Sequence, residues 1–196
     1  MIIKSVDTKH LQKEIQKWKE LAYKDELTGL YNRRGFIEES KKFIKESVFS
    51  KKYPRRRKNV FINNFSLVIF DINDFKKIND TYGHQKGDDV LVTFSKIILK
   101  RIRGVDLVAR WGGDEVVLGL VGASEKDAYI IAEDIRKKAQ SSKISFGSKK
   151  IGFSVSGGVA SFGKEVNFKK IFNVADKALY LAKKNCKNCI IMASKI

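Results

Sequence analysis

The alternation of apolar and polar positions predicts a chain of alternating helices and strands. Apolar residues recur at three- and four-residue spacing, which is typical of amphipathic helices, over residues 5–24, 32–49, 88–103, 125–140 and 168–184. Short apolar runs between turn residues predict strands over 65–71, 107–110, 115–121, 144–146 and 151–158. This order of elements predicts a layered domain with helices on a mostly antiparallel sheet.

The first predicted helix, over residues 5–24, carries an apolar stripe that needs a partner. The stripe consists of Val6, Leu11, Ile15, Trp18 and Leu21. It can pack on the surface of the domain itself, or it can form a short coiled coil between two protomers. The helix should break just after it, where Asp25 and Thr28 can cap backbone amides. We therefore expect a helical, signalling segment over 1–24 and one globular domain over 25–196.

Composition fits a single domain outside the membrane. A chain of 196 residues, 43% of them hydrophobic, can bury a substantial core. Its apolar runs are far shorter than the roughly 18–20 residues of a membrane-spanning helix. The segment Met1–Lys24 is too charged for a signal peptide. These features predict a cytoplasmic protein.

The formal net charge of +18 indicates attraction to anions such as phosphates, nucleic acids and acidic lipid headgroups. Lysines spread over many helices can equally form an ordinary solvated surface, so the charge predicts a polyanionic ligand only where it converges on a site. Basic residues cluster at 50–64, which contains KKYPRRRK and the only proline. We expect an exposed loop insertion there. A patch for a membrane or nucleic acid is the alternative, and nucleic acid is the weaker option because Tyr53 alone offers stacking nearby.

Cys186 and Cys189 form a CxxC pair near the C-terminus. A structural zinc site needs about four ligands, and the two histidines of the chain are remote in sequence. We therefore interpret the pair as two reduced cysteines of a cytosolic protein. A redox pair and half of a metal site are the alternatives.

Three carboxylates are expected to meet at one end of the sheet. Asp71 ends an apolar strand, and Asp114 and Glu115 lie in the turn of a predicted hairpin. Such crowding is costly unless a cation compensates it, and oxygen ligands suit Mg²⁺ or Mn²⁺ bound together with phosphates. Gly112 and Gly113 lack a Cβ, so a nucleotide can approach this turn closely. The sequence thus predicts metal-assisted phosphate chemistry, although an ordinary acidic hairpin would also explain GGDE.

Five segments together are more specific than this turn. They are DELTGLYNRR at 25–34, FDINDFKKINDTYGHQKGDDVL at 70–91, RGVDLVARWGGDEV at 103–116, FSVSGGVA at 153–160 and ADKALYLAKKNCKN at 175–188. In order and spacing they resemble the GGDEF family of diguanylate cyclases over about residues 25–190. The resemblance implies an α+β, palm-like nucleotidyl cyclase fold with a ferredoxin-like core and a mostly antiparallel sheet flanked by helices. It also implies two domains that face each other as half-sites, convert two GTP into cyclic di-GMP and release pyrophosphate.

The resemblance also assigns roles by motif position. It implies a metal site made by Asp71, the backbone carbonyl of Ile72, Asp114 and Glu115, the last two jointly supplying a metal ligand and the catalytic base. It implies that Asn79 and Asp88 contact the guanine and that His84 lies on the same nucleotide-binding helix–turn. It further implies nucleotide contacts by Gly112 and Gly113 at the glycine turn, and by Lys76, Lys183 and Lys187 at the phosphates. The Asp88 carboxylate can accept hydrogen bonds from both N1–H and N2–H₂ of guanine, whereas adenine lacks this pair of donors.

Arg103 and Asp106 form an RxxD ahead of Gly112, in the register of the family's inhibitory product site. Three positions depart from the family pattern: Val116 replaces the usual phenylalanine, Cys186 a frequent glycine, and Lys187 the usual arginine. Val116 should affect packing more than chemistry, whereas Lys187 keeps the charge but loses the bidentate fork of arginine.

We therefore predict a metal-dependent, product-inhibited diguanylate cyclase that works as a homodimer at least transiently. A weakly active or inactive receptor for cyclic di-GMP, acting through Arg103 and Asp106, is one alternative. A palm-fold cyclase that makes another cyclic nucleotide is the other. A sensor partner would supply the input signal.

Overall fold

The computed structural model describes residues 14–15, 18, 20–52, 64–162 and 168–196. Most of the first predicted helix lies outside the described residues, and so do residues 53–63 of the predicted basic loop. The second helix continues to Lys52, so it includes the first residues that we assigned to this loop. Within the described ranges, no helix is long and apolar enough to cross a membrane.

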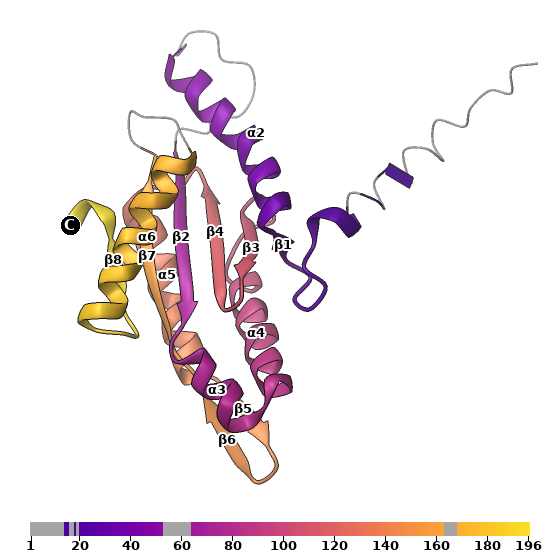
Figure 1. Cartoon of the computed structure of the whole chain (residues 1–196). Coiled ribbons are helices and arrows are strands. Elements are labelled where there is room, and N and C mark those ends of the chain that lie inside the picture. Colours follow the sequence, from indigo (N-terminus) through magenta and orange to yellow (C-terminus); the bar gives the residue numbers. More distant parts are fainter. Residues whose placement is uncertain (1–13, 16–17, 19, 53–63, 163–167) are drawn as a thin grey trace, which may run out of the picture.

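Helices and strands are interspersed along the chain (Figure 1). They are β1 (Tyr31–Asn32), α2 (Arg33–Lys52), β2 (Phe65–Ile72), α3 (Phe75–Tyr82), α4 (His84–Leu99), β3 (Leu107–Gly112), β4 (Glu115–Val121), α5 (Glu125–Ser141), β5 (Lys143–Phe146), β6 (Lys149–Gly152), β7 (Val155–Ser161), α6 (Phe168–Asn185), β8 (Ile190–Met192) and the 3₁₀ helix η1 (Ala193–Lys195). The main sheet has the order β1-β3-β4-β2-β7-β8. Its inner pairs are antiparallel, and only the outer pairs β1 with β3 and β7 with β8 are parallel. The predicted α+β fold with a mostly antiparallel sheet is confirmed.

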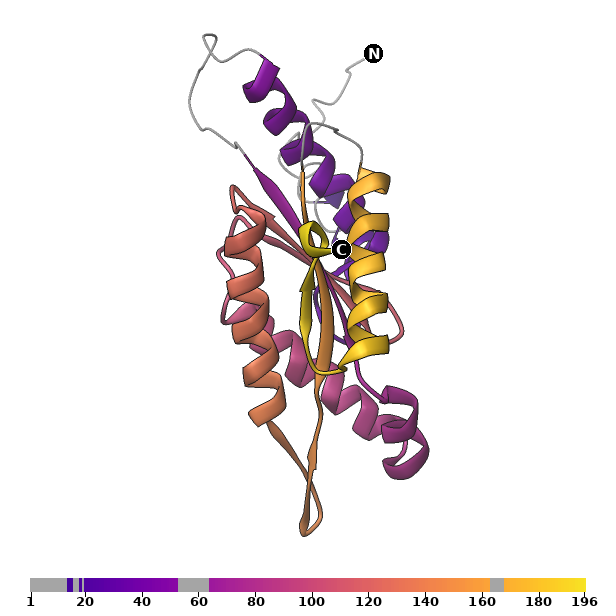
Figure 2. The same cartoon turned by 90° about the vertical axis from the view of Figure 1, so that its left-hand side faces the viewer.

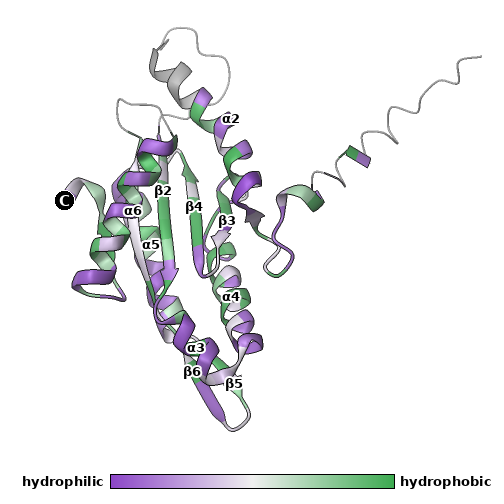
Figure 3. Cartoon of the chain, in the orientation of Figure 1, coloured by the Kyte–Doolittle hydropathy of each residue, from purple (hydrophilic) through white to green (hydrophobic). Residues whose placement is uncertain are grey.

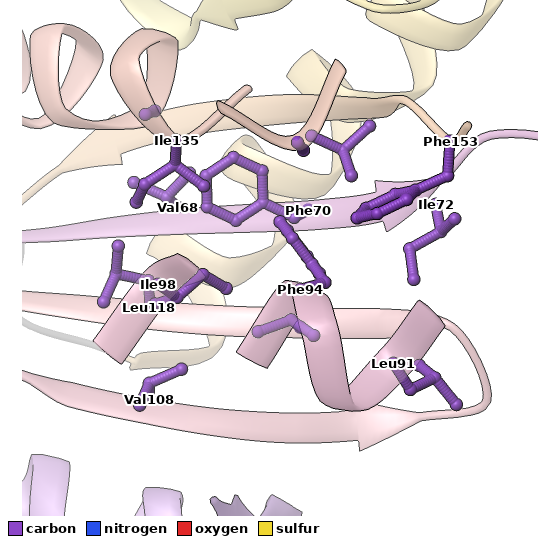
Figure 4. Close-up of a cluster of buried hydrophobic side chains, with 14 of the residues drawn as sticks. Val68, Phe70, Ile72, Leu91, Phe94, Ile98, Val108, Leu118, Ile135 and Phe153 are labelled. Carbon is purple, nitrogen blue, oxygen red and sulfur yellow. The ribbon is translucent and has the colours of Figure 1, made fainter. Parts of the chain in front are cut away.

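The central strand β2 is buried on both faces. Val68 and Phe70 face a core formed with α4 and α5, whereas Leu67 and Ile69 face a core formed with α2 and α6. Figure 2 shows these two helical layers on either side of the sheet. The ring of Phe70 meets that of Phe94 edge to face, with 5.6 Å between centres, in the core drawn in Figure 4. Burial on both faces explains why β2 is a continuous apolar run.

The helix predicted over 88–103 is displaced toward the N-terminus. Helix α4 begins at His84, directly after Gly83, whose φ of 85° separates it from α3. Its first turn reads His-Gln-Lys-Gly, so no apolar periodicity marks it. The helix ends at Leu99. The chain then forms a turn in which the amide of Asp106 donates to the carbonyl of Arg103 at 2.9 Å.

The strand predicted over 151–158 is in fact two strands in different sheets. Strand β6 pairs with β5 in a separate hairpin that projects beside α3, whereas β7 joins the main sheet. Between them, Phe153 packs on Phe94 in the core, and the carbonyl of Ser154 accepts from the amide of Asn73. The apolar pattern conceals this bend because the bending residue is itself a core residue.

The turn after the N-terminal helical residues forms as predicted. Oδ1 of Asp25 accepts hydrogen bonds from the amide (2.9 Å) and the hydroxyl (2.6 Å) of Thr28. Before this turn, Ile15, Trp18 and Leu21 are 49%, 67% and 66% exposed. These three side chains therefore do not pack on the domain, and for them the first of our two interpretations is wrong. Figure 3 shows that the strands β2 and β4, which lie between the helices, are mostly hydrophobic.

Candidate active site

Acidic side chains gather at the end of the sheet where β2 ends and β4 begins. Asp71 is paired in register with Glu115 on the neighbouring antiparallel strand, so the two side chains leave the same face of the sheet. Asp114 precedes Glu115 in the turn, and its charge acts on both of the other carboxylates. Ile72 follows Asp71 as the last residue of β2. The structure thus brings the three predicted carboxylates together.

Lys183 reaches this cluster from the last turn of α6. Its Nζ lies 2.5 Å from Oδ2 of Asp71, a residue that is only 5% exposed. The resemblance assigned Lys183 to phosphates, and in this structure its partner is a carboxylate. Asp71 therefore already attracts a positive charge.

The surroundings of the cluster disfavour the ionised forms of Asp71 and Glu115. Burial raises the pKa of Asp71, against the hydrogen bond from Lys183, and the charge of Asp114 raises it further. Burial also raises the pKa of Glu115, and the charge of Asp71 adds to this effect. One lysine does not offset three carboxylates, so an added cation would stabilise the ionised cluster.

The donor set fits a hard divalent ion. Among the described residues, no group of three or more His, Cys, Asp and Glu side chains is arranged so that it could hold a metal ion. Mg²⁺, however, is typically held by one or two carboxylates together with waters and substrate phosphates. Asp71 and Glu115 supply such a pair, and the oxygen chemistry of this end of the sheet suits Mg²⁺ or Mn²⁺. These residues therefore fit a metal that binds together with a nucleotide.

Arg110 links the glycine turn to the N-terminal turn, a role that the motifs had not assigned. Its Nε donates to the carbonyl of Gly113 at 2.9 Å, and its Nη1 lies 3.4 Å from Oδ2 of Asp25. Strand β3 extends to Gly112, so the turn is shorter than predicted. Gly113 has a φ of 51°, which suits glycine. An arginine two positions ahead of the glycine pair was the available signal in the sequence.

A second part of the site lies between α3 and α4. The side-chain oxygen of Asn79 is buried and has no hydrogen-bond partner. Gly87 lies directly against it, because a Cβ at this position would be 1.8 Å from that oxygen. Asp88 follows Gly87 on α4 and is exposed, as is His84 at the start of the helix. A buried free acceptor beside an exposed carboxylate suits a ligand that carries hydrogen-bond donors.

Basic side chains converge between the start of α3 and the end of α6. Nζ of Lys187 lies 2.9 Å from Oδ1 of Asp74, the N-cap of α3. Lys76 is exposed in the first turn of the same helix. Together with Lys183, these lysines place positive charge next to the acidic cluster. Part of the high net positive charge of the chain is thus concentrated beside the acidic cluster.

A series of hydrogen bonds joins the residues after Asp71 to β7 and to the turn after α6. The hydroxyl of Ser156 donates to Oδ1 of Asn73 at 2.7 Å and accepts from the amide of Asn188 at 3.0 Å. Nδ2 of Asn73 donates to the hydroxyl of Ser154 at 3.0 Å. Asn73 and Ser156 are buried, and our sequence interpretation assigned neither of them. A polar residue within the apolar FDIND segment was the available signal.

The interpretation of two reduced cysteines is wrong, because Cys186 and Cys189 form a disulfide. Helix α6 ends at Asn185, and the chain reverses through Lys187 and Asn188, which have positive φ angles of 40° and 46°. This reversal brings the two cysteines together. The turn geometry that decides their pairing is not visible in the CxxC spacing.

A hollow of about 510 Å³ lies beside α3. Lys77, Tyr82 and Ser154 are among the residues that line it, and none of the predicted site residues does. Size alone therefore does not locate the chemistry, and we assign the site to the carboxylates.

Residues 22–189 match the family described as "Diguanylate cyclase, GGDEF domain". The chain belongs to the GGDEF diguanylate cyclase family. Diguanylate cyclase A of Treponema denticola is 41% identical over 129 residues, 65% of this chain and 35% of that protein. Response regulator PleD of Caulobacter vibrioides is 32% identical over 187 residues, 94% of this chain and 39% of PleD. The chain thus spans well under half the length of these relatives.

Solved structures agree with this GGDEF fold. The coiled coil and GGDEF domain of DgcB from Caulobacter crescentus, in complex with c-di-GMP, matches with a TM-score of 0.80 at 23% identity over 95% of this chain and 93% of that one. Diguanylate cyclase SiaD from Pseudomonas aeruginosa, in complex with its activator SiaC, matches with a TM-score of 0.78 at 28% identity over 94% and 66%.

In this GGDEF domain the RxxD pair is bonded internally. The side chain of Asp106 is 1% exposed and accepts from the guanidinium of Arg103 (3.0 and 3.2 Å) and from the amides of Arg103 (2.9 Å) and Val121 (3.0 Å). The Arg103 side chain is 62% exposed and lines a hollow of about 290 Å³ together with Tyr31 and Leu99. Arg103 is therefore accessible to a ligand, whereas Asp106 holds the turn.

Val116, one of the three departures from the family pattern, lies in the core. Val116 is 1% exposed and belongs to the core formed with α4 and α5. Its neighbour Glu115 keeps its place opposite Asp71.

Proposed function

We propose that this GGDEF domain condenses two GTP molecules into cyclic di-GMP and releases pyrophosphate. The observation that carries the proposal is the in-register pair of Asp71 and Glu115, with Lys183 on one side and the free acceptor of Asn79 on neighbouring α3. The family and its curated relatives named diguanylate cyclases support the same activity.

Asn79 and Asp88 would select guanine. The buried oxygen of Asn79 lacks a partner, so binding a donor there removes the cost of an unsatisfied acceptor. The exposed Asp88 carboxylate can accept from N1–H and N2–H₂ of guanine together. Adenine lacks this pair of donors, so ATP would leave both groups unsatisfied.

Lys76, Lys183 and Lys187 would hold the triphosphate. Lys183 and Lys187 now pair with Asp71 and Asp74, and a nucleotide with its metal would exchange these partners. Asp71, the carbonyl of Ile72, Asp114 and Glu115 would hold the metal. When bound, Mg²⁺ or Mn²⁺ neutralises the triphosphate and makes the attacking sugar hydroxyl easier to deprotonate.

Asp114 and Glu115 would jointly accept the proton of that hydroxyl. The raised pKa of Glu115 brings the carboxyl closer to the operating range of a general base. The exposed turn at Gly112 leaves open space in which the nucleotide can lie.

Each domain would hold one GTP, and cyclic di-GMP is made from two. Two domains would therefore have to face each other so that their nucleotides can react. The exposed side chains of Ile15, Trp18 and Leu21 supply an apolar stripe for pairing the N-terminal helices. The structural relative DgcB includes a coiled coil, and SiaD was solved with an activator. We therefore propose a dimer, at least during turnover, that answers to a sensor or activator.

Nucleotide selection tests the proposal against a cyclase for another nucleotide. We expect GTP with Mg²⁺ to give cyclic di-GMP, and an equal amount of ATP to be left unconsumed. Asp88→Ala should raise the KM for GTP about tenfold or more, because it removes hydrogen bonds to the base. Asp89→Ala is the matched control, because Asp89 pairs with Lys86 on the same helix. Equal consumption of ATP, or an equal effect of both variants, would refute the guanine assignment.

A second candidate function is binding of the product, cyclic di-GMP. The exposed guanidinium of Arg103 beside a hollow of about 290 Å³ favours it. Such a site would make the cyclase product-inhibited, or would make a weakly active domain a receptor. Calorimetry should show binding that Arg103→Ala removes and that Arg101→Ala, which loses a pair with Asp134, retains. Equal binding by both variants would exclude Arg103.

A further inference from the structure

The turn between α6 and β8 is closed by the Cys186–Cys189 disulfide. Cys186 is exposed and Cys189 is half-buried, so an incoming thiol can approach from the Cys186 side. The bond encloses only Lys187 and Asn188. Neither the cyclase reaction nor its proposed ligands use the two sulfurs.

Both enclosed residues have conformations that non-glycine residues rarely adopt. Lys187 and Asn188 have φ angles of 40° and 46°. Such left-handed geometry costs free energy and persists only where the surrounding structure holds it in place. The disulfide spans this reversal directly. The amide of Lys187 also donates to the carbonyl of Ala182 at 2.8 Å, which anchors the turn to the helix end.

This turn is connected to the nucleotide site at two points. Nζ of Lys187 reaches Asp74 at the start of α3, at 2.9 Å. The amide of Asn188 donates to Ser156, whose hydroxyl bonds Asn73 two residues after Asp71. The turn therefore sets the position of one proposed phosphate lysine and contacts the support of the acidic cluster.

We propose that Cys186–Cys189 is a thiol–disulfide exchange site that controls the affinity of the domain for a nucleoside triphosphate. The proposal rests on the proposed function, because the ligand it affects is the same triphosphate. The reactant is a thiol reductant, either a dithiol or a monothiol present in excess. CxxC spacing is the usual arrangement for such exchange.

The exchange balances in two steps. A thiolate attacks the sulfur of Cys186, a mixed disulfide forms, and Cys189 leaves as a thiolate that takes up a proton. A second thiol, from the same dithiol or from another monothiol, then attacks the reductant's sulfur in the mixed disulfide. The reductant leaves as its own disulfide, and Cys186 becomes a thiol. Two electrons and two protons pass from the reductant to the protein.

Reduction removes the covalent closure of the turn. Lys187 and Asn188 can then relax toward more common backbone angles, and the Lys187 ammonium is no longer held beside the start of α3. The oxidised domain is therefore the form with higher affinity.

The experiment compares oxidised and reduced full chain. Calorimetry with a non-hydrolysable GTP analogue and Mg²⁺ should show about tenfold weaker binding after reduction by dithiothreitol, as loss of one charged contact predicts. Alkylation and mass measurement should count two thiols after reduction and none before. A parallel arm with a glutathione buffer distinguishes a monothiol from a dithiol reductant.

Variants separate the turn from general effects of reduction. The double variant Cys186→Ser, Cys189→Ser should bind weakly in both buffers. Lys187→Ala should bind weakly and lose the dependence on reduction, whereas Lys184→Ala, an exposed neighbour, should keep it. Equal affinity of the oxidised and the fully reduced chain would overturn the proposal, as would two free thiols in the air-oxidised protein.

Failure of the proposed function would give a different result. In that case the analogue binds neither form, and hydrogen exchange over residues 183–190 decides about the turn. Faster exchange after reduction supports an exchange site, and unchanged exchange overturns it.

Discussion

Asp71 and Glu115 occupy positions that are unfavourable for their ionised forms, and the proposed function assigns both of them to the reaction centre. Asp71 is buried and Glu115 is half-buried at the end of the sheet, and each carboxyl has a raised pKa. Natural active sites often retain such destabilised groups because their function requires the charge. A variant that removes the charge should therefore separate stability from activity.

Glu115→Gln should lower cyclase activity by about 10²–10⁴-fold and should stabilise the nucleotide-free domain at neutral pH. Burial and Asp71 raise the folded pKa of Glu115 above its ordinary value of 4.5. Below that ordinary value both states are protonated and no penalty exists. As pH rises through the window up to the raised folded pKa, the wild type loses stability, because the unfolded chain ionises more readily.

Thermal melts near neutral pH and below the ordinary carboxyl pKa measure this difference. The gain of Glu115→Gln should appear only at the higher pH, and Glu26→Gln at an exposed position should show none. A variant that melts below the wild type at neutral pH would contradict the electrostatic account.

Gly87→Ala tests whether Asn79 is held in place for a ligand. The new Cβ would be 1.8 Å from the Asn79 oxygen, so the amide must move. We expect about tenfold weaker binding of a GTP analogue and a stability loss of about 1–3 kcal/mol from overpacking. Gly104→Ala is the control, since nothing lies within 4 Å of its Cβ position. Unchanged nucleotide affinity in Gly87→Ala would remove Asn79 from the site.

At the scale of elements, the sheet fixes the site through register and through contacts distant in sequence. The run 65–71 was predicted as a strand to within one residue because both faces of β2 are buried in apolar cores. The start of α4 was missed because its first turn is polar. The motifs identified the carboxylates, but the pairs Lys183–Asp71 and Arg110–Asp25 depend on tertiary packing, which local spacing does not encode.

The connection from α4 to β3 predicts unequal roles for the two residues of the RxxD. Asp106→Ala would leave the amides of Arg103 and Val121 without their buried acceptor, so we expect a loss of about 2–4 kcal/mol. Arg103→Ala removes an exposed partner and should cost about 1 kcal/mol or less. Urea unfolding measures both values. Equal losses would show that the ion pair, and not the buried carboxylate alone, holds the turn.

At the scale of the whole molecule, the exposed stripe of the N-terminal helical residues predicts concentration-dependent activity. Activity per molecule should rise with protein concentration, and the double variant Trp18→Ser, Leu21→Ser should shift this rise to higher concentration. Ile130→Ser removes a similarly exposed apolar residue from α5 and should leave the curve unchanged. Activity per molecule that is the same at every concentration would contradict the paired half-sites.

The proposed function requires that the acidic end of the sheet converts GTP into cyclic di-GMP. The most direct measurement incubates the domain with GTP and Mg²⁺ and identifies the products by mass. We predict one cyclic di-GMP and two pyrophosphates for every two GTP consumed, and product formation that is about 10²–10⁴-fold slower with Glu115→Gln under the same conditions. GTP that remains intact at high enzyme concentration, while the protein is folded, would contradict the account.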